Sequence, residues 1–344
     1  MHATTQILKL TKRHPFTISR GTRTFSQNIF LSLHDNNLVG LGECDPGIFD
    51  QEVLLIKHAQ ALQDFLNDQD LSCLSIHEIW QRTEHNLPRT SQAALDIALW
   101  DLLGKKSSLP CFRLFGLSKS SQPTSITLGI TPHEQICARI NELLSEKRFR
   151  SLKIKLGSTD GIESDQRAFL IIKKAAEAFD VKLRVDANGG WSLAHAKIMC
   201  DWLAKQGVEY VEQPLRPELD DAMPELFKTR SLPIFVDESC HVSHDIVRLA
   251  TCVDGVNIKL MKCGGITEAL RMVATARAHK LKTMIGCMSE SSVAISAGTS
   301  IAALFDYIDL DSAFNLNPDP AQGMSLINGS VVPNNSPGHG ARLC

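Results

Sequence analysis

The 344-residue sequence has no run of about twenty apolar residues, so it predicts no membrane-spanning helix. It has no block of like charge, and its formal net charge is only −2, which argues against binding to nucleic acid or to an anionic membrane surface. The ten cysteines never form a C-x-x-C pair, and in a chain of this length they indicate free thiols in a reducing compartment. The first residues lack the continuous apolar segment of a signal peptide. We therefore expect a cytoplasmic protein.

The first part of the chain, residues 1–118, differs in texture from the rest. Its strand-like apolar runs are 5–10, 28–34 and 37–44, and its helical patterns are 51–67, 75–81 and 90–106. Residues 35–37, Asp-Asn-Asn, are typical of a hairpin turn, and Thr90 or Ser91 is a candidate N-cap of the last helix. This order predicts a small N-terminal α+β capping domain.

From about residue 124, short strand-like runs alternate with helical segments. The runs are 124–130, 151–157, 182–188, 208–214, 233–239, 255–261, 282–288 and 307–311. Eight strands with seven intervening helices predict a parallel α/β domain, a (β/α)7β modified TIM barrel over 119–314, with a doubly wound sheet as the less favoured alternative. Residues 315–344 show no eighth helix, and we expect this tail to pack back on the capping domain.

Charged residues occur inside these strands, although parallel strands are buried on both faces and buried charge is costly. The segment SLKIKLG, 151–157, puts Lys153 and Lys155 on one strand face and apolar side chains on the other. Polar side chains at the C-terminal ends of barrel strands belong to the active-site mouth. Such residues are Lys153, Lys155, Asp186, Glu212, Asp237, Lys259, Asp309 and Asp311. We predict that they form one polar cluster.

Asp186, Glu212 and Asp237 lie on three successive strands, so their carboxylates should converge. Three close carboxylates repel one another and need a cation to stay ionised. An all-oxygen set of ligands suits Mg²⁺ or Mn²⁺ and not zinc. The alternative is that each carboxylate forms its own salt bridge with a helix or a lysine.

Lys155 and Lys259 lie on the second and sixth strands, which are opposite each other in an eight-stranded barrel. This arrangement suits the removal of a proton from one face of a carbon and its return to the other face. A nearby metal ion and a neighbouring ammonium group would lower a lysine's pKa and make the neutral base accessible. The alternative is that the lysines only neutralise the carboxylates.

The chain contains the segments ALDIALWDLLGKKSSLPCFRLFG, the K-x-K of SLKIKLG, VDANGGW, VEQP, DES and NIKLMKCGG. These segments resemble those of the muconate-lactonizing subgroup of the enolase superfamily. They occur in the family's order, and the resemblance extends from about residue 15 to residue 314. It implies one Mg²⁺ per subunit held by the three carboxylates named above, with Lys155 and Lys259 as the acid/base catalysts. It also implies that Lys153 lies beside the metal-bound substrate carboxylate. We expect Lys262 to lie outside the mouth and Glu238 to point away from it.

Asp309 and Asp311 form a D-x-D pair on one strand face, which we expect across the mouth from the metal, where it suits a substrate ammonium group. The alternative is a strand end capped by its own backbone turn. The pair is similar to that of the dipeptide epimerases, which hold the amino group of a dipeptide with it. The resemblance therefore implies an isomerase, a dipeptide epimerase that transfers a proton at the α-carbon of the C-terminal residue.

Substrate preference depends on a loop of the capping domain. Arg20 and Arg23 in ISRGTR, 18–23, could bind an acidic side chain, and this segment resembles the same loop in L-Ala-D/L-Glu epimerases. The resemblance implies L-Ala-D/L-Glu, a product of murein peptide turnover, as the substrate. Cys287 and Met288 end the seventh strand and should line the pocket as apolar walls; the alternative for Cys287 is an ordinary core thiol.

Three other functions stay open. Within the superfamily the rival is an N-acylamino acid racemase or o-succinylbenzoate synthase, whose substrates lack the free ammonium group. Outside it the rivals are a metal-independent barrel hydrolase that uses two carboxylates and a binding protein with an inactive site. We expect a small dipeptide as the partner, no nucleic acid, no membrane, and a homo-oligomeric assembly.

Overall fold

The computed structural model describes residues 2–47, 52–68, 71, 73–146 and 148–344. Three antiparallel strands open the chain in the order β1 (His2–Ile18), β2 (Gly21–Asp35) and β3 (Leu38–Cys44). The pairing register of β1 and β2 shifts between Thr11 and Phe16. Asn36 forms the predicted hairpin turn with φ of 52°, a left-handed conformation that asparagine tolerates.

Among the described residues of the capping domain, four helices follow the strands. They are α1 (Glu52–Asp68), α2 (Ile76–Thr83), α3 (Arg89–Lys106) and α4 (Cys111–Leu114). Helix α3 packs closely on β3 because Gly42 has no side chain; a Cβ there would lie 1.9 Å from the Ala94 carbonyl oxygen. The N-cap of α3 is Pro88, and none of the described side chains caps this end. The prediction of Thr90 or Ser91 as the cap is wrong, since both lie in the first helical turn.

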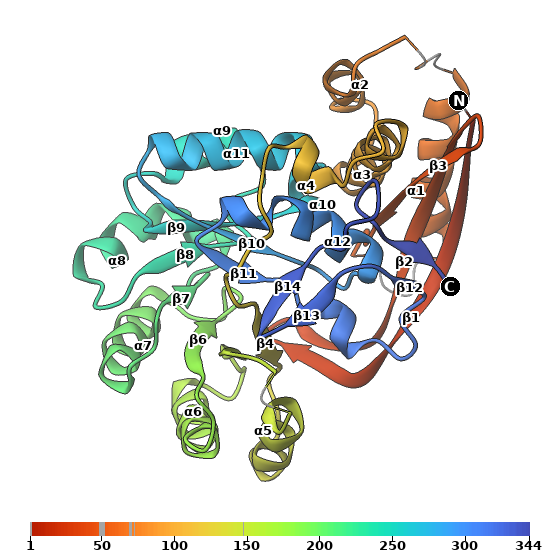
Figure 1. Cartoon of the computed structure of the whole chain (residues 1–344). Coiled ribbons are helices and arrows are strands. Elements are labelled where there is room, and N and C mark those ends of the chain that lie inside the picture. The colour runs from red at the N-terminus through yellow and green to blue at the C-terminus, as the bar shows by residue number, and fades with distance from the viewer. Residues whose placement is uncertain (1, 48–51, 69–70, 72, 147) are drawn as a thin grey trace.

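Eight parallel strands close into the predicted barrel (Figure 1). The strands are β4 (Ser125–Leu128), β5 (Ser151–Lys155), β6 (Lys182–Asp186), β7 (Val211–Glu212), β8 (Ile234–Val236), β9 (Gly255–Lys259), β10 (Lys282–Gly286) and β11 (Tyr307–Asp309). The order follows the sequence, and a bridge between Thr124 and Ile308 joins the first strand to the last. The (β/α)7β barrel with an N-terminal cap is thus confirmed.

Helices surround the barrel and separate its strands. They are α5 (Ile136–Leu144), α6 (Ile162–Ala176), α7 (Leu193–Gln206), α8 (Met223–Thr229), α9 (Ser243–Leu249), α10 (Leu260–Cys263), α11 (Ile266–Ala278) and α12 (Ser292–Ile301). Short 3-10 turns are η1 (His133–Gln135), η2 (Pro217–Ala222), η3 (Ala302–Leu304) and η4 (Ser312–Asn315). After β11 the chain enters η4, and residues 310–344, all of which are described, form no further α-helix.

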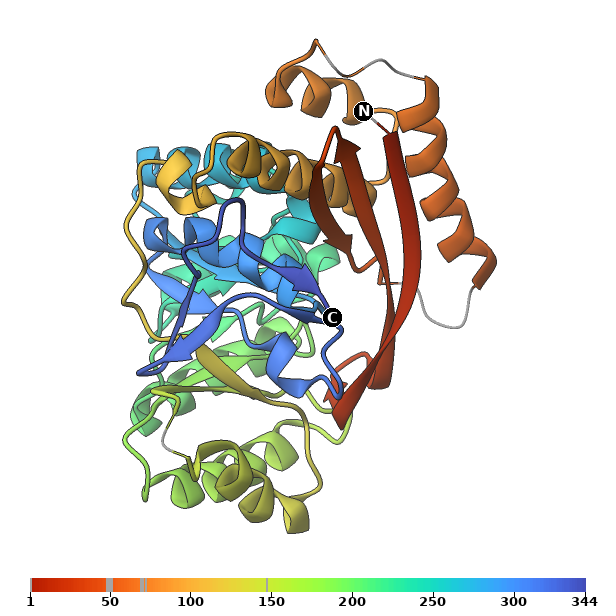
Figure 2. The ribbon, with the colours of Figure 1, turned by 45° about the vertical axis from the view of Figure 1, so that its right-hand side comes forward.

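The β1–β2 hairpin extends from the capping domain along the barrel, and the C-terminal segment lies beside it (Figure 2). Lys12 pairs with Leu316 across an isolated bridge, and Pro110 with Gly338. The tail's short strands are β12 (Ala321–Gln322), β13 (Ser325–Ile327), β14 (Ser330–Val332) and β15 (Arg342–Leu343). The tail also bonds to the barrel, because Thr124 N donates to the Gly329 carbonyl at 2.8 Å. The domain limits at 118 and 314 stay predictions.

In the described part of the chain, no helix combines the length and the apolar character needed to cross a membrane.

Candidate active site

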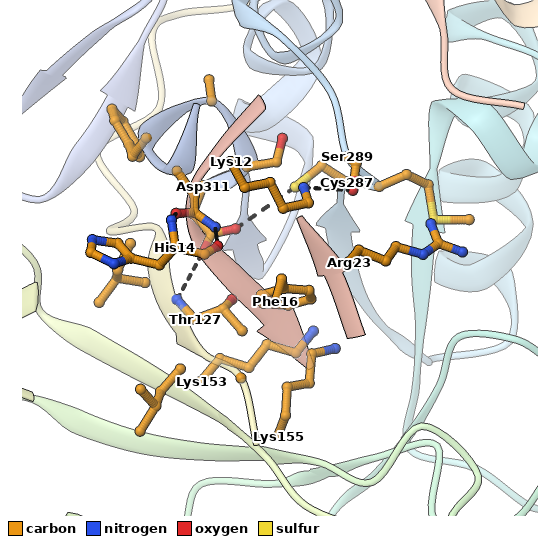
Figure 3. A pocket seen from close by; sticks show the side chains of 18 of the residues that line it. Lys12, His14, Phe16, Arg23, Thr127, Lys153, Lys155, Cys287, Ser289 and Asp311 are labelled. Atoms are coloured by element: carbon orange, nitrogen blue, oxygen red, sulfur yellow. Dashed lines mark hydrogen bonds between the residues drawn. The ribbon is translucent and has the colours of Figure 1, made fainter. Parts of the chain in front are cut away.

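A cavity of about 750 Å³ opens at the C-terminal ends of the barrel strands, beneath the β1–β2 hairpin. Figure 3 shows Lys153 and Lys155 of β5 extending toward the strands that carry Lys12, Phe16 and Arg23. The barrel supplies one wall and the capping domain the other, so the cavity is complete only when the two domains are together.

Asp186, Glu212 and Asp237 converge at this mouth as predicted. The first two end β6 and β7 and pair in register, and Asp237 follows β8. All three are buried, and one carboxylate oxygen from each lies within 4.8 Å of those of the others. Such a compact, all-oxygen set fits a hard divalent cation.

The lysines around this triad stabilise its three negative charges unevenly. Burial would raise the pKa of Asp186, but Lys155 and Lys153 outweigh burial and hold that pKa below its usual value. Burial and then the Asp186 charge raise the pKa of Glu212 to about 7. Glu212 is thus the carboxylate whose negative charge is least stabilised, and a bound cation would remove that penalty. The residues therefore fit a divalent metal ion.

Lys155 and Lys259 contact different members of the triad. Lys155 Nζ lies 2.5 Å from Asp186 Oδ2, and Lys259 Nζ lies 2.6 Å from Asp237 Oδ2. Their strands, β5 and β9, are four places apart in the closed eight-stranded sheet, so the two amines approach the triad from opposite sides. Burial would lower the pKa of Lys259, but Asp237 outweighs burial and raises it.

Lys153 occupies the centre of the mouth. Its Nζ lies 2.7 Å from Asp309 Oδ2, 2.8 Å from Glu212 Oε2 and 3.1 Å from Asp186 Oδ2. Burial opposes its positive charge, but these three carboxylates hold the pKa of Lys153 well above its usual value. Lys153 therefore carries a positive charge in the cavity wall, where a substrate carboxylate could reach it.

The D-x-D pair lies nearer to the triad than predicted. Lys153 alone separates Asp309 from Glu212, so the expectation that the pair lies across the mouth from the metal is wrong for Asp309. Asp311 Oδ2 accepts a hydrogen bond of 2.6 Å from the Thr127 backbone N–H. Burial and then the Asp309 charge raise the pKa of Asp311 to about 6. Both carboxylates line the cavity.

Two further charged residues depart from the predictions. Lys262 was expected outside the mouth, but it is buried there, with its Nζ 2.6 Å from Asp237 Oδ1. Glu238 was expected to point away, but it lines the cavity and its Oε1 lies 2.7 Å from Arg20 Nη1. Strand parity gave the wrong direction in this case because β8 ends at Val236, before Glu238.

The residues predicted to set specificity all line the cavity. Arg20 lies in the β1–β2 turn, where it also donates to the Asn188 carbonyl at 3.3 Å, and Arg23 lies in β2. Cys287 Sγ donates to the Asp309 carbonyl at 3.3 Å, and Met288 beside it is exposed. The apolar wall predicted from Cys287 thus adjoins the D-x-D pair.

Two supporting residues were not identified from the sequence. Gln213 follows Glu212 with φ of 38°, and its Oε1 accepts hydrogen bonds from the backbone N–H groups of Asp237 and Ser239 at 2.8 and 3.2 Å. Asn257 Nδ2 donates to Glu212 Oε1 at 2.8 Å. Gln213 belongs to the VEQP segment, which was a usable signal, whereas nothing local marks Asn257.

Comparison with known proteins extends this description over nearly the whole chain. Residues 2–116 match the family described as mandelate racemase/muconate lactonizing enzyme, N-terminal domain, and residues 135–344 match the family described as enolase C-terminal domain-like. The chain is 51% identical to a hydrophobic dipeptide epimerase of Roseobacter litoralis, over 97% of this chain and 96% of the relative. It is 32% identical to an L-Ala-D/L-Glu epimerase of Bacteroides thetaiotaomicron, over 96% and 85% of the two chains.

A solved structure resembles the whole chain. The dipeptide epimerase of Enterococcus faecalis, in complex with Mg and the dipeptide L-Leu-L-Tyr, superposes with a TM-score of 0.90 at 32% identity, over 99% of this chain and 98% of the other.

Proposed function

The chain belongs to the mandelate racemase/muconate lactonizing enzyme family of the enolase superfamily, and from this premise we propose that it is a Mg²⁺-dependent dipeptide epimerase. Its enzyme class is that of the racemases and epimerases. The observation that carries the proposal is the position of Lys155 and Lys259, each bonded to a different end of one carboxylate triad.

The triad supplies the electrostatic part of the proposed reaction. Asp186, Glu212 and Asp237 would hold one Mg²⁺ per subunit. When bound, the ion stabilises the negative charge that develops on the substrate carboxylate as the α-proton leaves. Lys153, which keeps its charge, would bind the same carboxylate and fix its position relative to the two catalytic lysines.

The two lysines perform the proton transfer. Ligation of Asp186 and Asp237 would weaken their ion pairs with Lys155 and Lys259, and a weaker pair lowers the pKa of the amine. The neutral lysine removes the α-proton from one face of the substrate, and the protonated lysine delivers a proton to the other. The chiral centre is thereby inverted, and exchange of roles between the lysines runs the reaction in reverse.

The D-x-D pair would recognise the substrate's amino group. Asp309 and Asp311 line the cavity beside Lys153, and only one of the two is held by that lysine. A dipeptide's ammonium group matches this excess negative charge, whereas an N-acylated amino acid has no cation to place there. This contrast favours a dipeptide over the substrates of the N-acylamino acid racemases.

We propose that dipeptides with a hydrophobic C-terminal residue are preferred over L-Ala-D/L-Glu. Arg20, one of the two arginines on which the acidic substrate was predicted, is already engaged by Glu238 and the Asn188 carbonyl. Phe16 and Ile18 of the hairpin supply an apolar roof over the cavity. The name of the Roseobacter relative points in the same direction. Murein peptides would be the source of substrate only if L-Ala-D/L-Glu were preferred.

A dipeptide panel tests the proposal. The purified protein is incubated in D₂O with L-Ala-L-Glu, L-Ala-L-Lys, L-Ala-L-Phe, L-Leu-L-Tyr and the N-acetylated form of the last, with Mg²⁺ or with excess chelator. Proton NMR then follows exchange at the C-terminal α-carbon. We expect fastest exchange with the aromatic dipeptides, none with the N-acetylated form and none after chelation.

Each contrary result excludes a definite part of the proposal. A preference for L-Ala-L-Glu restores the argument from the arginines, and full activity after chelation excludes the metal. Faster turnover of the N-acetylated substrate indicates an N-acylamino acid racemase. We also propose that the enzyme is cytoplasmic and homo-oligomeric. Sizing chromatography with light scattering measures its oligomeric state.

A further inference from the structure

Lys262 lines the cavity beside Asp237, and the proposed mechanism gives it no role. It is in α10, one helical turn after Lys259, and its side chain is 5% exposed. Its Nζ donates to the carbonyls of Cys240 and Asn257, at 2.9 and 3.0 Å, and to that of Asp237. The same nitrogen lies 2.6 Å from Asp237 Oδ1. An ammonium group has three N–H donors, so the three carbonyls use all of them.

Asp237 thus lies between two lysines that differ in their mobility. Among the described residues, Lys259 Nζ donates a hydrogen bond to Asp237 Oδ2 alone. This amine can therefore leave when the carboxylate binds a metal ion. Lys262 is held by the backbone carbonyls of Cys240, after β8, and of Asn257, in the adjacent β9, and these carbonyls do not depend on the metal. Its positive charge therefore stays against Oδ1 whatever Oδ2 binds.

This asymmetry limits how Asp237 can act as a ligand. A divalent ion that bound both oxygens of Asp237 would have to share Oδ1 with the Lys262 ammonium group and would be repelled by it. Mg²⁺ requires near-octahedral geometry and takes single carboxylate oxygens, whereas Ca²⁺ accepts bidentate carboxylates and a higher coordination number. The positive charge of Lys262 beside Oδ1 therefore disfavours the coordination that Ca²⁺ would use.

We propose that Lys262 is a positioning residue that restricts Asp237 to one metal-ligating oxygen and thereby gives the site its preference for Mg²⁺ over Ca²⁺. The inference rests on the proposed Mg²⁺ site and adds selectivity to it. Lys262 is a positioning residue and not a catalytic one, because backbone carbonyls use its three donors and its charge lies against Asp237.

Calorimetric titration of the metal-free protein with Mg²⁺ and separately with Ca²⁺ tests this role without measuring catalysis. The wild type should bind Mg²⁺ more tightly than Ca²⁺. In Lys262→Met the ratio of the two dissociation constants should shift toward Ca²⁺ by at least about tenfold, the lower end of the effects seen for residues that support metal ligands. Loss of the lysine's charge affects two divalent ions alike, so the ratio isolates the change in ligation.

Lys173→Met is the matched control. Lys173 Nζ donates to the Gln206 carbonyl at 2.9 Å and to Gln206 Oε1 at 3.2 Å, between the outer helices α6 and α7. It too is a lysine that holds a backbone carbonyl, but it lies away from the cavity. We expect this variant to lose some thermal stability and to keep the wild-type ratio of Mg²⁺ to Ca²⁺ affinities.

Two results would overturn the inference. One is an unchanged ratio in a folded Lys262→Met. The other is a wild type that binds Ca²⁺ at least as tightly as Mg²⁺. This second result needs no variant, so the inference can be tested even if Lys262→Met does not fold. A wild type that binds neither ion but epimerises dipeptides would instead contradict the proposed Mg²⁺ dependence, so the two failures are distinguishable.

Discussion

The two ends of the barrel both bury charge, but they do so in different ways. At the N-terminal end, Arg184 of β6 donates to Glu209 and to Ser125 Oγ, both at 2.8 Å. Its guanidinium carbon lies 5.1 Å from the ring centre of Tyr307 and 5.7 Å from that of Tyr210. All of these partners belong to the protein itself, so this charge is compensated without a ligand.

At the C-terminal end, two residues further along the same strand, Asp186 is contacted by both Lys153 and Lys155. Lys153 in turn is contacted by three carboxylates, and one of them, Glu212, has a pKa raised to about 7. Here several partners share one charge. A ligand can therefore replace one partner while the others still compensate the charge. This difference agrees with the proposed placement of the reaction at the C-terminal end of the barrel.

The largest expected effect is on kcat, at the C-terminal end of the barrel. Replacement of Lys155 or Lys259 by Met should lower kcat by about a thousandfold, because each lysine is needed as acid or base on one substrate face. Single-turnover α-proton exchange in D₂O should show that each variant still exchanges one epimer faster than the other. Equal loss of exchange with both epimers in both variants would contradict the assignment of one lysine to each face.

A smaller effect is expected at the D-x-D pair. Asp311→Asn should raise KM for dipeptides by about tenfold or more, since a charge-assisted contact to the ammonium group is lost. The folded-state pKa of Asp311 is raised to about 6, so its binding form is present above that pH and is lost as the pH falls through it. Steady-state kinetics between pH 5 and 8 should show an acid limb near about pH 6 in kcat/KM that is absent from Asp311→Asn.

A wild-type profile without that limb, or an unchanged KM in the variant, would exclude Asp311 from ammonium binding. Asp35→Asn is a suitable control, because Asp35 lies at the end of β2 and forms a surface pair with Lys106.

At the opposite end of the barrel, stability should change and catalysis should not. Arg184→Met removes the partner of Ser125 and one of the two cations that pair with Glu209, but Lys182 remains 2.9 Å from Glu209. We expect the free energy of unfolding to fall by about 2 kcal/mol, measured by urea denaturation. A loss of kcat in the folded variant as large as that of Lys155→Met would remove the distinction between the two ends.

The smallest effect is expected at Arg20. Its pair with Glu238 is half exposed at the hairpin turn, and such surface pairs contribute little. Arg20→Met should therefore change kcat/KM for L-Ala-L-Phe by less than about threefold, well below one charge-assisted contact. A selective loss of activity on L-Ala-L-Glu alone would show that Arg20 recognises an acidic side chain.

The order of strands and the convergence of the triad could be predicted because strand ends of a parallel barrel meet at one edge. The direction of side chains beyond the end of a strand could not be predicted. Glu238 turns into the cavity because β8 ends before it, and Lys262 turns back onto Asp237 because α10 begins immediately after Lys259. We predicted Asp309 too far from the triad. Strand parity shows on which face of the strand Asp309 lies, but it does not show that Lys153 contacts both Asp309 and Glu212.

The break in register between Thr11 and Phe16 divides the β1–β2 hairpin into a base that belongs to the capping domain and a tip that roofs the cavity. The tip meets the barrel through hydrogen bonds such as that of Ser19 Oγ to the Asn188 carbonyl, at 3.0 Å. We expect entry of a dipeptide and escape of its epimer to involve this tip, whose contacts with the barrel can break while the pairing of the hairpin's base is kept. The chemical steps are fastest for the best substrates, so motion of the hairpin should limit their turnover. Added viscogen should therefore slow turnover of these substrates more than turnover of poor ones.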